Sequence, residues 1–140
     1  MKRNGSGQRF VNSLEQTFKN QNLNYELEDM EDKVHIFIPT KSARSTITGF
    51  TLYISEYAIQ VIIFDIVRDI EKSQKYLTVL NEVNIEHSFL KFLINDSNSV
   101  IGTYDFLHEY LNVDSFIDFL VSSLDSIDSV FDSFMKVRYS

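Results

Sequence analysis

The segment 58–67 constrains the fold most, because its apolar residues fall on both faces of any strand that it forms. Successive side chains of a strand point to opposite faces. The two sets are Ile59, Val61 and Ile63 on one face, and Ile62, Phe64 and Ile66 on the other. A strand that is apolar on both faces lies centrally in a sheet or has something covering each side. The chain is therefore expected to build a sheet around residues 58–67.

The other predicted strands surround this segment in two hairpins. Alternating apolar residues and β-branched or aromatic residues predict strands over about residues 23–28, 33–38, 47–55, 58–67, 88–95 and 100–107. The acidic stretch 28–32 makes the turn of the first hairpin, and Pro39 ends its second strand. The tetrapeptide 96–99, Asp-Ser-Asn-Ser, is rich in turn-forming residues and makes the turn of the second hairpin.

Helical periodicity appears in three segments. Apolar residues that recur every three or four positions predict helices over about residues 8–22, 71–86 and 112–136. Ser6 is expected to cap the first helix and Asn112 the last. The predicted order is helix, four strands, helix, two strands, helix. Without strand–helix–strand alternation the sheet is antiparallel, so the fold class is α+β, in a single domain over residues 1–140 with a flexible start over 1–7.

Charge and apolar runs exclude several classes of protein. The net charge of −7 repels a phosphate backbone, so no nucleic-acid binding is expected. Lys41 and Arg44 share a loop, which we interpret as solvated surface. The longest apolar run, 61–64, is far shorter than the about 20 residues of a membrane-spanning helix, so no membrane partner is expected. The basic start runs into polar sequence rather than the apolar core of a secretory signal, which predicts a cytoplasmic protein.

Residue patterns typical of catalysis or cofactor binding are missing. The chain has no cysteine, and its three histidines, His35, His87 and His108, fall on different predicted elements. A Gly-x-Ser-x-Gly elbow and a phosphate-binding glycine loop are both absent. The acidic turn 28–32 lacks the glycine of a calcium loop and is interpreted as solvated. We therefore predict no catalytic, cofactor-binding or metal-binding residues and no enzyme activity, although a hydrolase with histidines and carboxylates clustered in a deep pocket stays open.

A set of short motifs lies between residues 77 and 135. It consists of Leu80-Asn81-Glu82-Val83-Asn84, Phe89-Leu90-Lys91-Phe92, the Asn95-Asp96 turn, Tyr104-Asp105 and the long helix from Asn112. In these motifs the chain resembles the YbjN-like domain family, whose fold is similar to that of type III secretion chaperones. The resemblance implies a binding or regulatory role, often as a homodimer, and in the chaperone relatives the capture of an unfolded client segment. We interpret Asn81 and Asn84 as structural residues that cap a helix end.

The second face of the predicted sheet is the candidate interaction surface. The residues assigned to a partner or dimer surface are Phe37, Tyr53, Phe64, Phe89 and Phe92. If the helices cover one face only, the other face is too apolar for water and marks an interface. If the helices divide between the two faces, the chain is an ordinary monomer. We predict a non-enzymatic protein-binding or chaperone-like regulatory module, and the alternative is an acidic immunity or inhibitor protein that neutralises a toxin or enzyme.

Overall fold

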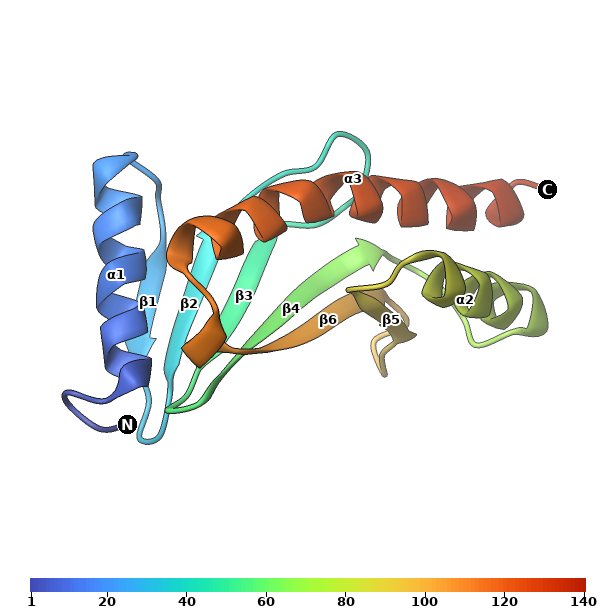
Figure 1. The fold of residues 1–140 in the computed structure, drawn as a ribbon. Coiled ribbons are helices and arrows are strands. Elements are labelled where there is room, and N and C mark those ends of the chain that lie inside the picture. The colour runs from blue at the N-terminus through green and yellow to red at the C-terminus, as the bar shows by residue number, and fades with distance from the viewer.

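The predicted α+β fold is confirmed by the computed structural model, which describes residues 1–140 apart from the side chain of Tyr110. The helices are α1 (Ser6–Asn20), α2 (Gln74–Glu86) and α3 (Val113–Arg138), with a 3-10 turn, η1, at His108–Tyr110. The strands are β1 (Glu26–Asp29), β2 (Val34–Pro39), β3 (Gly49–Ile54), β4 (Ala58–Val67), β5 (Lys91–Ile94) and β6 (Val100–Leu107). They form one antiparallel sheet in the order β1-β2-β3-β4-β6-β5 (Figure 1).

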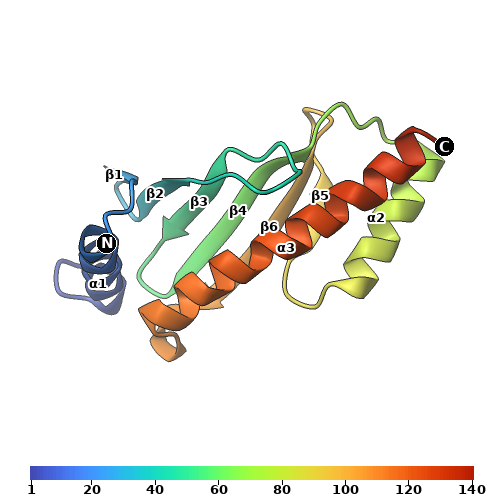
Figure 2. The same ribbon diagram turned by 90° about the horizontal axis from the view of Figure 1, so that it is seen from above.

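All three helices lie on the same side of the sheet. Figures 1 and 2 show α3 crossing the sheet, α1 beside β1 and β2, and α2 beyond β5. The buried apolar side chains of the sheet point to this side, among them Ile36, Leu52, Val61, Phe92 and Val100. The arrangement in which the helices divide between the two faces is thereby ruled out. None of the helices within the described residues is long and apolar enough to cross a membrane.

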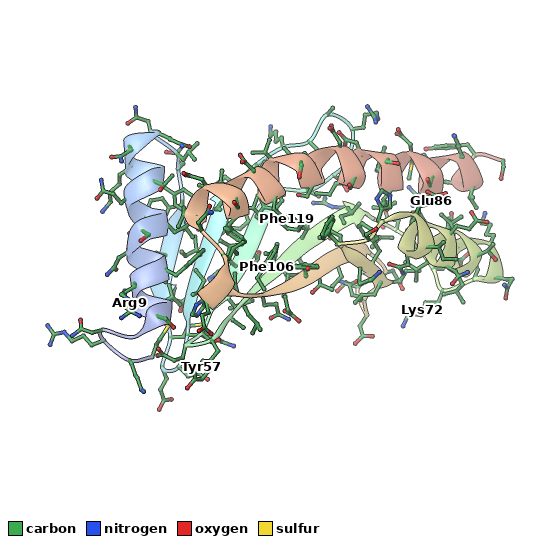
Figure 3. The ribbon with its side chains drawn as sticks, viewed as in Figure 1. Arg9, Tyr57, Lys72, Glu86, Phe106 and Phe119 are labelled. Carbon is green, nitrogen blue, oxygen red and sulfur yellow. The ribbon has the colours of Figure 1, made fainter. Side chains whose placement is uncertain are left out.

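An aromatic cluster joins the sheet to α3. Phe106 of β6 and Phe119 of α3 meet with ring centroids 4.8 Å apart and their planes nearly perpendicular (Figure 3). Phe106 also meets Phe116 at 5.5 Å, and Phe116 meets Phe10 of α1 at 5.9 Å, both in edge-to-face geometry. Such edge-to-face pairs add to the stabilisation from burial alone. The cluster therefore ties α1, α3 and β6 into one core.

A bulge in β4 corrects the predicted direction of one side chain. The register between β4 and β6 shifts between Ile63 and Val67, and Asp65 has a positive φ of 58°. Ile66 therefore points to the helix side, where it is fully buried and where a Cβ on Gly102 would lie 3.2 Å from its Cδ1. The prediction that Ile66 shares a face with Ile62 and Phe64 was wrong, because from Ile63 to Val67 β4 advances four residues while β6 advances two, and this bulge breaks the alternation.

The ends of α1 differ from the prediction in detail. Gly5, not Ser6, occupies the N-cap position, and the Ser6 hydroxyl donates to the carbonyl of Glu56. At the other end Asn22 adopts a left-handed conformation, and the N–H of Leu23 returns to the carbonyl of Phe18. This closure keeps residues 23–25 out of the sheet, so β1 begins later than predicted.

The last helix begins as predicted. Asn112 is the N-cap residue of α3, and its side-chain oxygen accepts a hydrogen bond of 2.7 Å from the backbone N–H of Ser115. A free N–H at a helix start is thereby satisfied.

The loop 41–46 is exposed at most of its residues and is anchored to α3 through its backbone. The buried carboxylate of Asp128 on α3 accepts hydrogen bonds from the backbone N–H groups of Ala43, Arg44 and Ser45 at 3.1, 2.9 and 3.0 Å. The Arg44 side chain forms an ion pair with Asp132 at 2.9 Å. Lys41 and Arg44 are exposed, in agreement with their interpretation as solvated surface, and the ion pair additionally holds Arg44 beside α3.

Candidate functional site

The candidate site is the side of the sheet that no helix covers, here called the open face (Figures 1 and 2). Directly opposed residues of neighbouring antiparallel strands point to the same side, so the register identifies its members. Its apolar side chains are half-buried or exposed and comprise Phe37, Tyr53, Ile62, Phe64, Leu93, Ile101 and Leu107. They run from β2 across the sheet to β5. Polar residues lie among them, since Gln60, Asp105, Thr103 and Lys91 project to the same face, so the apolar side chains form smaller groups.

The part of the open face near β1 to β3 is covered by its own polar side chains. The His35 ring stacks on Tyr53 with centroids 5.0 Å apart, and the Lys33 ammonium lies 5.0 Å from the same Tyr53 ring. A Cβ on Gly49 would lie 2.7 Å from the Cζ of Phe37, so the Phe37 ring rests on the backbone of β3. These contacts shield the apolar atoms here from water.

Over β4, β6 and β5 the apolar side chains Ile62, Phe64, Leu93 and Ile101 lie near one another, with Thr103 and Lys91 beside them. Leu107 is exposed at the other end of β6, where it pairs with Ala58 beyond Gln60 and Asp105. Phe64 and Leu93 retain 41% and 40% of their accessible surface. Ile62 and Ile101 are half-buried beside them. This portion is the strongest candidate for a contact surface, because burying apolar area there would remove it from water.

The structure places three of the five predicted surface residues on the open face. Phe37, Tyr53 and Phe64 each project to it. Phe92 does not: it is 3% exposed and lies on the helix side, so its assignment to the surface was wrong. Phe89 is 63% exposed but lies in the loop before β5, where its ring meets Tyr104 and Phe119 on the helix side.

The predicted boundary of β5 explains the error at Phe92. The strand begins at Lys91 rather than at residue 88, and Phe92 pairs with Gly102, whose missing side chain leaves room for the Phe92 ring. Three members of the open face were not predicted, namely Leu93, Ile101 and Leu107. The alternation of β5 and β6 with Val100 and Phe92 inward was the signal that could have found them.

A groove of about 400 Å³ lies on the helix side between the end of α1 and the first half of α3. Its apolar lining residues are Phe18, Leu23, Ile38, Phe50, Ile117, Leu120, Val121 and Leu124, with Asn22, Asn24, Pro39 and Thr40 completing it. None of these side chains is charged. The groove suits an uncharged, apolar group and is the second possible contact region of the molecule.

The histidines lie apart, on separate elements as predicted. His35 is on β2 with its Nδ1 3.9 Å from a carboxylate oxygen of Glu28, and His87 follows α2. His108 is buried against Phe10 and hydrogen-bonded to the carbonyl of Ser55 at 3.1 Å. Within the described part of the chain, no three histidine or carboxylate side chains are grouped as metal ligands.

Comparison with known proteins supplies the family. The model of the YbjN family, described as "Putative bacterial sensory transduction regulator", matches residues 11–136. The chain belongs to the YbjN family. Its structure is similar to the crystal structure of YbjN from E. coli, described as "a putative transcription regulator", with a TM-score of 0.60 and 12% identity over 86% of this chain and 87% of that chain. No curated protein matches the chain significantly. The predicted family and fold are confirmed, and the family description supports a regulatory module.

The motif Leu80-Asn81-Glu82-Val83-Asn84, which resembles the YbjN family, has a structural role at the edge of the sheet. The side-chain N–H of Asn84 donates to the carbonyl of Phe92 at 2.9 Å, and the Asn84 side-chain oxygen accepts from the N–H of Phe92 at 2.8 Å. The amide thus occupies the place of a neighbouring strand beside β5. Asn84 is structural as predicted, but it caps a strand edge instead of the end of α2. A capped edge is protected from pairing with another chain.

We expect Asn84→Ala to lower the free energy of unfolding by about 1–3 kcal/mol, because the backbone groups of Phe92 lose both partners. Urea denaturation measures the loss, and faster amide exchange at Phe92 locates it. Asn81→Ala is the matched control, since Asn81 is exposed on the same helix. Equal stabilities of the two variants would contradict the capping role.

Proposed function

We propose that this member of the YbjN family is a non-enzymatic regulatory module that acts by binding another protein through its open face. The observation that carries the proposal is the arrangement of all three helices on one side of the sheet, which leaves the apolar group Ile62, Phe64, Leu93 and Ile101 without a helix over it on the other. Exposed apolar patches of this kind mark interaction sites in soluble proteins.

The charge of the chain favours a different protein over a second copy. Each chain carries a net charge of −7, so two copies repel each other as they approach. A basic partner is attracted by the same charge, and the attraction accelerates its association. We therefore assign the open face to a basic partner protein, with a homodimer as the competing occupant.

Phe64 is the best residue for testing the open face. Its ring is 41% exposed, so Phe64→Glu places a charge in the proposed interface with little disturbance of the core. We expect binding of the purified partner, identified by affinity purification and mass spectrometry, to weaken about tenfold or more, as for a central aromatic contact. Calorimetric titration measures the change.

Two variants make this test decisive. Ile85→Glu introduces the same charge at an exposed apolar residue of α2 and should leave binding unchanged. Val121→Glu places the charge at the rim of the groove between α1 and α3. Loss of binding in Val121→Glu but not in Phe64→Glu would contradict the proposal and assign the groove instead. A wild-type dimer in sedimentation that Phe64→Glu dissociates would assign the open face to a second copy.

A further inference from the structure

The two edges of the sheet differ in whether they can accept another strand. At β5 the Asn84 side chain occupies the backbone groups of Phe92, and α2 packs beside the strand (Figure 2). At the opposite edge β1 pairs only with β2, and each of its four residues is exposed. β1 is therefore the edge that is accessible to a partner.

The register shows which backbone groups of β1 face outward. The N–H of Met30 donates to the carbonyl of Lys33, which closes the hairpin to β2 at this pair. Hydrogen-bonded and non-bonded pairs alternate in an antiparallel ladder, so the N–H and C=O groups of Leu27 and Asp29 point away from β2. These two residues offer the hydrogen-bonding pattern that an added strand requires.

Carboxylates on β1 indicate which side chains an added strand would carry. Glu26 and Glu28 project to the open face, opposite Phe37 and His35. A strand laid beside β1 would have every second side chain next to these carboxylates. Opposite charges on adjacent strands stabilise the pair, and like charges destabilise it. The β1 edge thus disfavours pairing with the β1 of a second copy and favours lysine or arginine at alternate positions.

We propose that β1 binds an extended basic segment of the partner protein by strand addition, with the basic side chains beside Glu26 and Glu28. The added strand enlarges the open face at its β1 edge, so the segment and the remaining surface of the partner bind on the same side of the sheet. This inference deepens the proposed function and rests on it for the identity of the partner.

The test uses the full chain and an acetylated eight-residue peptide that alternates lysine and valine. Upon peptide addition, amide hydrogen exchange should slow at Leu27 and Asp29. The peptide should bind Glu26→Gln/Glu28→Gln about fivefold more weakly, as expected for the loss of two exposed charge pairs. Glu82→Gln/Glu86→Gln removes the same charge from the exposed side of α2 and should leave binding unchanged.

A second peptide separates strand addition from attraction by charge alone. N-methylation of alternate valine residues removes the N–H groups that an added strand directs at Leu27 and Asp29, and it should abolish protection of these amides. Unchanged protection with the methylated peptide, or protection at β5 instead of β1, would overturn the inference. Phe64→Glu should bind the peptide normally, so failure at β1 and failure of the open face are distinguishable.

Discussion

Phe116→Ala is expected to lower the free energy of unfolding by about 3–5 kcal/mol, the range for removing a buried aromatic ring. Phe116 is fully buried, and its ring meets Phe10 of α1 and Phe106 of β6 edge to face. Removing the ring leaves a cavity where α1, α3 and the sheet meet. Urea denaturation followed by far-UV circular dichroism measures the change.

Phe89→Ala is the control for the aromatic cluster. It removes the same atoms from a residue that is mostly exposed and meets its aromatic neighbours only at about 6 Å. We expect a loss below about 1 kcal/mol, as for surface substitutions. Equal losses in the two variants would show that burial of Phe116 does not govern the stability of the core.

The elements with strong local signals were predictable from the sequence. The bounds of β4 and β6 agree with the prediction, because β-branched and aromatic residues dominate both and turn residues flank them. The start of α3 was also predictable, since the Asn112 side chain satisfies a backbone group only three residues away. These signals act over a few residues and need no information about the rest of the fold.

Features that depend on distant contacts were not predictable. The bulge at Asp65 is supported from the loop before β3, where the Thr46 and Ser45 hydroxyls donate to the carbonyls of Asp65 and Ile66. The role of Asn84 depends on β5, which follows α2 by a loop. In both cases the side chain is evident in the sequence, but the fold determines which backbone group it contacts.

Only part of the candidate site was predictable, because one feature of it has a local signal and another depends on distant contacts. The alternation of β2 and β3 placed Phe37 and Tyr53 on the second face, and the two-sided pattern of β4 placed Phe64 there. Whether that face is open depends on the side to which each helix packs, and the helix patterns contain no such information. The sequence is therefore compatible with two arrangements, and the structure has all three helices on one side.

Asp128→Asn is expected to destabilise the chain by roughly 2–3 kcal/mol at pH 7, because its carboxylate accepts three backbone N–H groups in a buried position. An amide has one acceptor oxygen, and its NH₂ group faces a donor that it cannot bind. The loop 41–46 would lose its anchor on α3. Faster amide exchange at Ala43, Arg44 and Ser45 would locate the effect.

The contribution of Asp128 should depend on pH. Burial alone would raise the pKa of the Asp128 carboxyl, but hydrogen bonds from the backbone of Arg44, the Ser42 hydroxyl and the backbone of Ser45 and Ala43 hold the pKa below its usual value. A carboxyl whose pKa is lower in the folded state stabilises the fold above its unfolded pKa of about 4, and that stabilisation is lost as pH falls through the folded pKa.

Unfolding measured at a series of pH values tests this linkage. The difference in stability between wild type and Asp128→Asn should be constant from about pH 5 to 7 and should shrink below about pH 4, where the wild-type carboxyl becomes protonated. Asp118→Asn, at an exposed position of the same helix, should match wild type throughout. A difference for Asp128→Asn that persists undiminished at low pH would show that the shape of the side chain, rather than its charge, anchors the loop to α3.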